Sequence, residues 1–467
     1  MNAIDEILTH NPHCVAIHAD NSSDWLAVDQ WATDNQLVIV PVPHFFTPSQ
    51  IAHMVKQAGV DCVFCQHDLT TFWQSLGFYE VTIYGALTVL TRTLERAVGL
   101  PTGTHKITFT SGSTAEPKGV CLSLSHLQTV GQSLAQATEH LGLKRHLSVL
   151  PYSILLENMA AVYANSYTNM GQGLKIISPS LAQVGLQGSG QFQPEKLVSA
   201  MVEHQADSLI LMPAMLKSLL NYLTENPTDL SWLRFMAVGG AVCPPMLIEQ
   251  AHRMGLPVYQ GYGISECGSV ICLNNALNSA DSVGRPLNHA DINLDQDKQI
   301  IYYGPQFLAY LGDEDKGSEL TKNQAYATGD IGTIDSQGKL TIRGRLSHLI
   351  VNGFGRNISP EWLEAELLAL TAIQQVMVVG DGQAFLTALC VTDCDGETLN
   401  QLIQAINEQL PDYARLRAAV KVPPFTELDG TLTATGKLIR SEIYKKHATQ
   451  LEQIYDNQPT PICQHAF

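Results

Sequence analysis

Apolar residues in the first hundred positions fall into short runs, separated by segments with helical spacing. Residues 14–17, 37–42 and 61–65 each form a compact apolar run, which predicts three buried strands. Between these runs, residues 25–31 and 49–58 repeat their apolar positions at helical spacing. Strands that alternate with helices are typical of a mostly parallel sheet whose faces are covered by helices.

The same alternation continues to about residue 255, and then the pattern changes. The expected strands are 148–151, 174–177, 208–212 and 235–238, and the expected helices are 194–204, 215–224 and 245–255. From Asp281 onward the apolar runs become shorter and are typical of antiparallel strands. These strands are expected at 300–303, 331–335 and 339–343, with a hairpin turn at 336–338 between the last two.

A domain boundary is expected near residues 344–347, because a compact α+β pattern follows it. The elements expected there are helices at 360–370 and 397–410 and strands at 376–379 and 385–391. The last part of the chain, 448–467, is polar and has no periodic pattern, which predicts a surface tail. The expected domains are therefore residues 1–345 and 346–467.

Composition and charge exclude several classes of function. The chain has 27 Lys and Arg against 44 Asp and Glu, a net charge of −17, whereas nucleic acids and acidic membranes need clustered basic residues. We therefore expect no nucleic-acid partner. The sequence has no run of about 18 apolar residues and no signal-peptide pattern at its start, so we expect no membrane span and a cytoplasmic location. The ten cysteines are thinly spread, which is typical of reduced thiols rather than of a disulfide framework.

The densest chemical signal is the loop TSGSTAEPKGV at 110–120. It follows a strand expected at 106–109 and precedes a segment with helical spacing. Hydroxyls, backbone N–H groups and one lysine in such a strand-to-helix loop can wrap a polyphosphate. The loop is not a Walker A motif, because Pro117 and Gly119 flank Lys118 where that motif has a glycine and a hydroxyl residue. The plain alternative is a Ser/Gly-rich surface turn.

Shorter motifs downstream carry further chemistry. The segment YQGYGISE at 259–266 combines aromatic rings, a flexible backbone and a hydroxyl with the carboxylate of Glu266, which can hold Mg²⁺ beside a phosphate. Asp330 follows a threonine and a glycine in a tight turn, where a carboxylate is suited to gripping ribose hydroxyls. Arg345 lies at the expected domain boundary, and Lys437 follows a glycine near the C-terminus.

Together these motifs resemble the core motifs of the adenylate-forming enzymes, the superfamily of acyl- and aryl-CoA synthetases, peptide-synthetase adenylation domains and firefly luciferase. The resemblance runs from about Val15 to His447. It rests on five motifs in order, at 110–120, 262–266, 328–330, 344–364 and 435–440. Five motifs at the expected separations are far more specific than any one of them.

The resemblance implies an α/β fold with two domains. The large N-terminal domain would contain helix-covered, mostly parallel sheets plus a small barrel-like β part. The small C-terminal domain would be a mobile α+β unit that carries Lys437.

The family's reaction has two half-reactions. A carboxylate attacks the α-phosphate of ATP to give acyl-AMP and pyrophosphate, and a thiol then displaces AMP. By resemblance, the residues that bind ATP or AMP are Thr110, Ser111, Gly112, Ser113, Thr114, Lys118, Gly240, Ala241, Tyr262, Gly263, Asp330 and Arg345. Ser265 would contact the α-phosphate and Glu266 would coordinate Mg²⁺. Lys437 would stabilise the charge that builds on the transferring phosphoryl group.

The thiol step implies a second arrangement of the domains. The small domain would rotate about a hinge at Ser347, a position where the family usually has Asp or Lys. Gly353, Gly355 and Arg356 would then meet the thiol acceptor. Ala115 replaces a usual glycine in the phosphate loop, so a backbone with positive φ would be strained there.

Three weaker features favour plain structural roles. Cys62 and Cys65 mimic half of a metal site, but a single CxxC without a second pair indicates buried strand cysteines. Cys267 has no evident base nearby, which favours packing over a nucleophilic role. The helix expected at 360–370 carries acids that indicate a solvated face rather than a metal site: Glu361, Glu364 and Glu366.

The resemblance therefore implies an ATP- and Mg²⁺-dependent ligase that converts a carboxylic acid to acyl-AMP and then to a CoA thioester. Fatty or other apolar acids, and thus fatty acid metabolism, are expected. Ile154 and Leu156 make the acid's approach apolar where long-chain acyl-CoA synthetases have a His and an aromatic residue.

Two alternatives differ in acceptor and in class. The thiol could belong to the phosphopantetheine arm of an acyl carrier protein, which a basic patch of Arg415, Arg417 and Lys421 would attract. The chain could instead be a turnover-deficient paralogue that binds a nucleotide or a partner. The intact polar residues of the core motifs argue against this second alternative.

Overall fold

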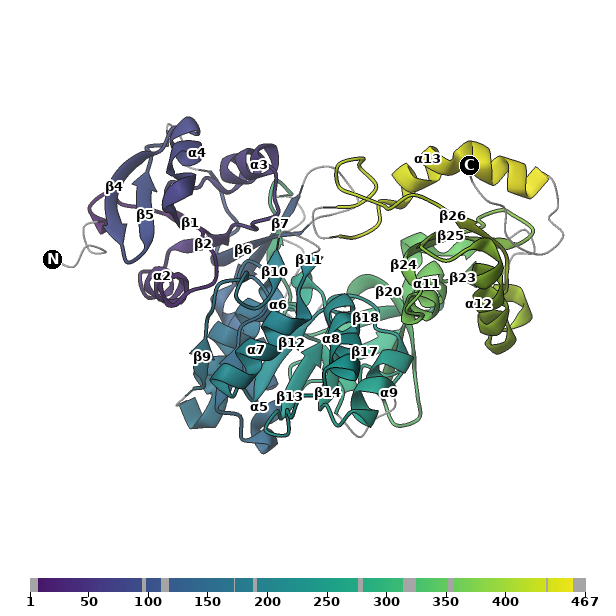
Figure 1. Ribbon diagram of the computed structural model, residues 1–467. Coiled ribbons are helices and arrows are strands. Elements are labelled where there is room, and N and C mark those ends of the chain that lie inside the picture. The colour runs from purple at the N-terminus through teal and green to yellow at the C-terminus, as the bar shows by residue number, and fades with distance from the viewer. Residues whose placement is uncertain are drawn as a thin grey trace.

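Two helix-covered sheets form the large N-terminal part of the protein, and a smaller sheet domain follows them (Figure 1). The structure is a computed structural model. It describes residues 7–94, 98–110, 117–171, 173–187, 191–275, 280–313, 325–351, 357–433 and 436–456. The predicted α/β class is confirmed by this arrangement of elements.

The first sheet has eight strands in the order β19-β7-β6-β2-β1-β3-β5-β4. Its strands are β1 (Cys14–His18), β2 (Val38–Pro41), β3 (Cys62–Gln66), β4 (Tyr79–Tyr84), β5 (Leu87–Thr91), β6 (Thr104–Thr110), β7 (Lys118–Ser123) and β19 (Ala309–Tyr310). The middle four, β6, β2, β1 and β3, run parallel, and the margins are antiparallel. Helices α2 (Ser23–Asp34), α3 (Pro48–Ala58) and α4 (Thr70–Ser75) follow strands of this sheet.

Local sequence sets the ends of these helices. Helix α3 begins with a capping box, in which the Thr47 side chain accepts from the backbone of Gln50 and the Gln50 side chain accepts from the backbone of Thr47. Pro48 occupies the first turn, where its missing N–H costs nothing. Gly59 ends the helix in the left-handed conformation that glycine adopts without strain.

The second sheet has seven strands in the order β16-β15-β14-β13-β12-β8-β9. Its strands are β8 (Arg145–Leu147), β9 (Lys175–Ile177), β12 (Ser208–Leu211), β13 (Phe235–Val238), β14 (Val258–Tyr262), β15 (Cys272–Leu273) and β16 (Arg285–Pro286). The first five of these are parallel neighbours, and β15 and β16 turn antiparallel. The longer helices of this region are α5 (Leu124–Thr138), α7 (Pro194–His204), α8 (Pro213–Glu225) and α9 (Pro245–Arg253), and a short α6 (Leu155–Asn158) leads into a π-helical turn.

A four-stranded antiparallel sheet leads into the small domain. It contains β17 (Asp291–Leu294), β18 (Gln299–Tyr303), β20 (Tyr326–Ile334) and β21 (Leu340–Arg345). The small domain then has a three-stranded sheet of β24 (Ile373–Val379), β25 (Leu386–Thr392) and β26 (Leu416–Lys421). Its helices are α11 (Pro360–Ala369), α12 (Gly396–Gln409) and α13 (Arg440–Asp456), and its short strands are β22 (Ile350–Val351) and β23 (Asn357–Ile358).

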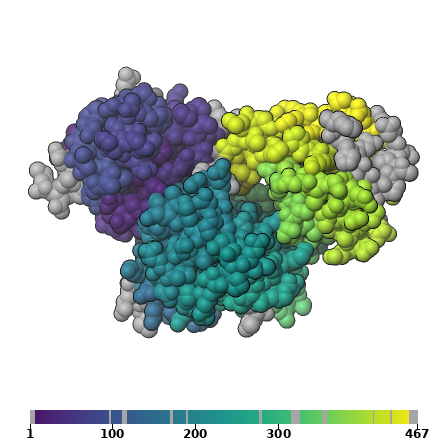
Figure 2. All heavy atoms as spheres, in the orientation of Figure 1, coloured from purple at the N-terminus to yellow at the C-terminus, as the bar shows by residue number. Residues whose placement is uncertain are grey.

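The buried cores follow the same division of the chain. Two cores are built from residues between Ile350 and Ile454 alone. The other cores contain residues no later than Leu340. Figure 2 shows the small domain, green to yellow, seated against the large one.

Several sequence expectations about the fold were wrong. Residues 148–151 lie beyond the end of β8, where the chain turns away towards α6. The end of the chain is not a tail from residue 448, because α13 continues to Asp456 and buries Leu451 and Ile454 in the small domain. The phosphate-type loop does not join a strand to a helix. Its two ends, Thr110 and Lys118, are paired across the antiparallel strands β6 and β7, so it closes a β-hairpin.

Among the helices of the described residues, none is both long and apolar enough to cross a bilayer. The nine cysteines in the same residues are all free thiols.

Candidate active site

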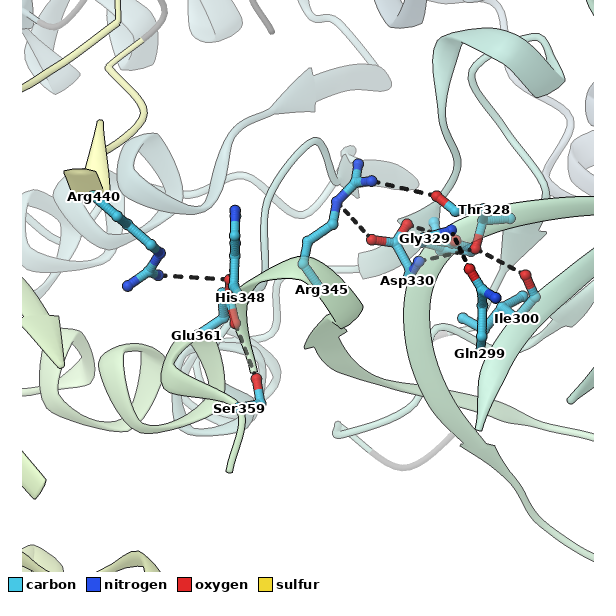
Figure 3. Close-up of polar contacts among 11 residues, drawn as sticks. Gln299, Ile300, Thr328, Gly329, Asp330, Arg345, His348, Ser359, Glu361 and Arg440 are labelled. Carbon is cyan, nitrogen blue, oxygen red and sulfur yellow. Dashed lines mark hydrogen bonds and ion pairs between the residues drawn. The ribbon is translucent and has the colours of Figure 1, made fainter. Parts of the chain in front are cut away.

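Asp330 stands at the centre of a polar cluster at the edge of the antiparallel sheet. Its Oδ2 accepts a hydrogen bond of 2.8 Å from the Tyr262 hydroxyl, and its Oδ1 is 2.8 Å from Nε of Arg345. Asp330 and Arg345 are direct partners in the register of β20 and β21, which explains why the ion pair forms (Figure 3). The residue itself is only 6% exposed.

The turn before Asp330 is fixed by hydrogen bonds on both sides. The Thr328 hydroxyl donates to the carbonyl of Ile300 at 2.9 Å and accepts from the backbone N–H of Asp330 at 3.1 Å. The N–H of Gly329 donates to the side chain of Gln299 at 3.1 Å (Figure 3). The carboxylate is therefore held in place before any ligand arrives.

Burial sets the protonation states in this cluster. Burial raises the pKa of Asp330, and the positive charge of Arg345 opposes that rise. Burial also raises the pKa of the Tyr262 hydroxyl, and the nearby charge of Asp330 adds to the effect. Tyr262 therefore stays protonated and remains a hydrogen-bond donor.

A second cluster surrounds Glu266, in the short 3₁₀ helix Ser265–Cys267 that follows β14. The hydroxyl of Tyr310 donates to Oε1 of Glu266 at 2.7 Å. Tyr310 lies on β19, which pairs with β7, and Nζ of Lys118 is 5.9 Å from the centre of its ring. Tyr310 thus joins the lysine of the phosphate-type hairpin to the carboxylate of a distant motif.

Sequence reasoning missed Tyr310, because it belongs to no motif and its strand contributes only two residues. Burial raises the pKa of its hydroxyl, and the charge of Glu266 raises it further, so the group remains a donor. The pairing of β19 with β7 brings it to the site, and a single sequence contains no signal for that pairing.

Two predicted site glycines, one after β13 and one after β14, have close neighbours. Gly240 has a φ of +80°, and a Cβ there would lie 2.7 Å from the sulfur of Met212. Gly263 lies so close to the backbone of Ser269 that a Cβ would be 2.0 Å from its carbonyl oxygen. Neither position has room for a side chain unless its neighbours shift, and Ala241 follows Gly240 at the surface.

Lys437 approaches these clusters from the small domain. Its turn is closed by hydrogen bonds from the N–H of Lys437 to the Thr433 hydroxyl (3.0 Å) and from the N–H of Thr433 to the Lys437 carbonyl (2.8 Å). Surrounding protein removes part of the hydration of the ammonium and lowers its pKa. The charge of Arg345 lowers it further, while the carboxylates of Asp330 and Glu266 oppose this. The side chain remains exposed to solvent. Charges on the large domain thus influence the ammonium of Lys437 on the small domain.

The turn of Lys437 is anchored within the small domain by Arg440. The guanidinium of Arg440 makes a bidentate pair with Glu364 of α11, with distances of 2.7 and 2.5 Å. Glu361 accepts from the Ser359 hydroxyl and contacts His348 and Arg440 (Figure 3). The expectation that this helix presents a solvated acidic face was wrong for Glu361 and Glu364, because both carboxylates are largely buried and paired with cations.

Some predicted site residues lie outside the described residues. These are Ser111, Gly112, Ser113, Thr114 and Ala115 of the hairpin loop and Gly353, Gly355 and Arg356 of the thiol-acceptor segment. Ser347, the expected hinge, lies in the short 3₁₀ helix Leu346–His348 that links β21 to the small domain.

The protein side chains at the site could hold Mg²⁺ only together with ligands from the substrate. No group of three or more His, Cys, Asp or Glu side chains in the described part of the chain could hold a metal ion. Glu266 supplies one hard carboxylate, and Mg²⁺ commonly takes one or two protein carboxylates together with substrate phosphates and water. Cys62 and Cys65 belong to different buried cores, and Cys267 is buried with a raised pKa, so these thiols have packing roles.

Comparisons with known proteins define the class. Residues 8–302 match the family described as AMP-binding enzyme, and residues 348–459 match the AMP-binding enzyme C-terminal domain. The chain belongs to the AMP-binding enzyme family. This finding confirms the resemblance to adenylate-forming enzymes. Together with the relatives described next, it also confirms that the protein is an enzyme of the AMP-forming acid–thiol ligase class.

The relatives give a more particular likeness. The chain is 28% identical over 366 residues to a 2-succinylbenzoate–CoA ligase of Bacillus mycoides, covering 73% of this chain and 69% of that protein. Among solved structures, the o-succinylbenzoate CoA synthetase of Bacillus subtilis with its acyl-adenylate matches with a TM-score of 0.74 and 19% identity, over 94% and 90% of the two chains. The anthranilate CoA ligase AuaEII with anthranoyl-AMP matches with a TM-score of 0.77 and 17% identity, over 95% and 89%. These two structures show that the fold is shared.

Proposed function

We propose that this protein activates a carboxylic acid with ATP and transfers the acyl group to CoA. In the first half-reaction a carboxylate oxygen attacks the α-phosphorus, the bond to pyrophosphate breaks, and acyl-AMP forms. In the second the thiol sulfur attacks the acyl carbon and loses its proton, and AMP leaves with the bridging oxygen. The observation that carries the proposal is the buried Asp330, held by Tyr262 and Arg345, in a chain that belongs to the AMP-binding enzyme family.

Each residue of this cluster has a role that follows from its chemistry. Asp330 would accept hydrogen bonds from the ribose hydroxyls, and Arg345 would share that contact. Tyr262 would stack on the adenine while its hydroxyl keeps Asp330 oriented. Lys437 would offset the negative charge that develops on the α-phosphate oxygens during attack.

The phosphates and the metal would lie on the side of the hairpin. Thr110 and Lys118 would flank the β- and γ-phosphates, and Ser265 would contact the α-phosphate. Mg²⁺, held by Glu266 together with phosphate oxygens, would neutralise phosphate charge. The hydrogen bond from Tyr310 would orient the Glu266 carboxylate for this purpose.

We also propose a domain division after Arg345, with the hinge at Ser347. The separation of the buried cores on either side of this point supports it. The small domain would rotate there between the two half-reactions, so the contact of Lys437 with the site would belong to adenylation.

For the acid, we propose the aromatic class to which 2-succinylbenzoate belongs. Two of the relatives named above carry that name and the third is named for anthranilate, so the expected link to fatty acid metabolism has no support from them. Leu156 and Met212, partly buried apolar side chains of the same core as Ile154, lie beside Gly239 and Gly240 respectively, which suits the flat apolar face of an aromatic ring.

CoA is the preferred acceptor. Two residues of the basic patch that an acyl carrier protein would need already have polar partners, because Arg415 pairs with Asp412 at 2.7 Å and Nζ of Lys421 donates to the carbonyl of Cys394 at 3.1 Å. Arg417 is left as the one residue of that patch without a described partner.

A single experiment tests acid and acceptor together. The protein is incubated with ATP, Mg²⁺ and a panel of 2-succinylbenzoate, anthranilate, benzoate and fatty acids, and acyl-AMP is trapped and weighed by mass spectrometry. We expect the aromatic acids to give acyl-AMP and, with free CoA, the thioester. Exclusive activation of fatty acids would overturn the proposed acid class. Transfer to a holo acyl carrier protein with none to CoA would overturn the acceptor. Absence of any acyl-AMP would favour the turnover-deficient alternative.

A further inference from the structure

One contact between the domains is made by a lysine and three carbonyl groups. Lys217 lies on α8 of the large domain, and its Nζ is 2.6 Å from the carbonyl oxygen of Leu368, 3.0 Å from that of Leu370 and 3.2 Å from that of Ile373. These oxygens lie at the end of α11 and the start of β24, in the small domain. An ammonium group has three N–H donors, so Lys217 can direct all of them across the boundary.

The end of α11 is suited to a cation. The helix ends at Ala369, and Leu370 is extended with φ −69° and ψ 128°, so the last carbonyl groups lack helical partners. The C-terminal end of a helix also carries partial negative charge. No carboxylate forms an ion pair with Lys217 among the described residues, and loss of hydration lowers the pKa of this half-buried lysine. The polar partners of its ammonium are therefore supplied by the small domain.

The same helix holds the turn that carries Lys437. Glu364, 6% exposed on α11, binds both outer nitrogens of Arg440, which begins α13. Arg440 lies three residues after Lys437 in the sequence. A shift of α11 therefore shifts Arg440 and, with it, Lys437.

We propose that Lys217 is a positioning residue that acts through the small domain. By binding the end of α11, it holds the arrangement in which Lys437 lies within electrostatic range of Asp330 and Glu266. This inference rests on the proposed function, which gives Lys437 its role in adenylation. The contact is also easy to release, because the ammonium regains water and leaves no unpaired buried carboxylate behind. It therefore suits an arrangement that is broken before the thiol step.

The test compares the two half-reactions in matched variants. Lys217→Met removes the donors and keeps an unbranched apolar stem, and Lys217→Arg keeps the positive charge. Lys196→Met removes an exposed lysine of α7 in the same domain and serves as the control. For Lys217→Met we expect the single-turnover rate of acyl-AMP formation to fall roughly 10-fold, the loss that follows from hydrogen bonds to a charged group. We expect the KM for ATP to stay unchanged, as should thioester formation from supplied acyl-AMP.

Rescue and domain position complete the test. Lys217→Arg should recover most of the adenylation rate, and Lys196→Met should match the unmodified protein. Spin labels at the exposed positions Gln128 and Gln404, on α5 and α12, report the distance between the domains in ligand-free protein. Lys217→Met should broaden that distance distribution.

Two results would overturn the inference: an equal loss in both half-reactions, or a distance distribution that Lys217→Met leaves unchanged. The distance measurement needs no turnover. If no acid supports adenylation, the proposed function fails, and the distance distribution alone decides whether Lys217 holds the small domain.

Discussion

The two domains contribute to the site in opposite ways. On the large domain Asp330 is buried, and both of its oxygens are occupied, by Tyr262 and by Arg345. On the small domain Lys437 is exposed, and the hydrogen bonds of its turn stay within the turn. The surroundings of Asp330 are thus preorganised by local contacts, whereas the position of Lys437 depends on where its whole domain lies. We therefore expect substitution of Asp330 to weaken nucleotide binding and substitution of Lys437 to weaken one chemical step.

The largest effect should come from Lys437→Ala. Loss of one positioned charge donor to a developing phosphoryl anion should slow acyl-AMP formation by ~10²–10³-fold, by analogy with loss of an oxyanion-hole donor. Thioester formation from chemically supplied acyl-AMP should survive far better. Single-turnover measurements of each half-reaction check this. An equal loss in both half-reactions would show that Lys437 has no role specific to adenylation, and the two domains would then not differ in the way described above.

A smaller effect is expected for Asp330→Asn, which keeps the shape and removes the charge. The variant weakens the contacts with Arg345 and with the ribose hydroxyls, and each charged hydrogen bond is worth ~1.5–3 kcal/mol. The KM for ATP should rise by about 10–100-fold, with less change in the chemical step. The unmodified protein should discriminate against 2′- and 3′-deoxy-ATP. Equal binding of deoxy-ATP and ATP would show that the ribose lies elsewhere.

Tyr310→Phe should cost less, because it removes one hydroxyl and keeps the ring. The Glu266 carboxylate would lose the donor that orients it, at a cost of about 1.5 kcal/mol or roughly 10-fold. We expect this loss to appear as a higher Mg²⁺ requirement for adenylation. Tyr303→Phe, at an exposed tyrosine on β18, is the matched control. If neither variant changes the Mg²⁺ requirement, Tyr310 has no role in metal binding.

The smallest effect is a shift in pH dependence. Desolvation and Arg345 lower the pKa of Lys437, so its ammonium loses a proton at a pH below the ordinary lysine range. Because adenylation needs the cation, its rate should fall as pH rises through that lowered pKa. Lys437→Arg should move this alkaline limb to higher pH, since a guanidinium keeps its proton. If the unmodified protein and Lys437→Arg lose activity at the same alkaline pH, another group is titrating.

Much of the fold could be predicted because local pattern and packing agree. The expected helix at 194–204 and the expected strand at 235–238 match α7 and β13 in both bounds. The surface tail expected from residue 448 was wrong because α13 is polar overall, and its few buried residues, such as Leu451 and Ile454, meet a core made by distant strands. A sparse apolar stripe is a weak signal when its partner surface is unknown.

The candidate site, too, could be predicted only where the local sequence carries a signal. Asp330, Arg345 and Glu266 stand in motifs, so residue type and spacing indicated them. Tyr310 reaches the site through the pairing of β19 with β7, and Lys217 contacts the end of α11. Both contacts join segments that are remote in sequence. Such contacts depend on tertiary structure, and no local spacing in one sequence encodes them.

We propose that a carboxylate oxygen of the acid attacks the α-phosphorus of ATP in this site. The most direct test gives the protein an acid labelled with ¹⁸O in the carboxylate, together with ATP, Mg²⁺ and CoA, and measures the mass of the released nucleotide. We expect one labelled oxygen in AMP, because the bridging oxygen stays with phosphorus when the thiol displaces AMP from the acyl carbon. Label in inorganic phosphate with release of ADP, or unlabelled AMP beside a newly formed thioester, would contradict it.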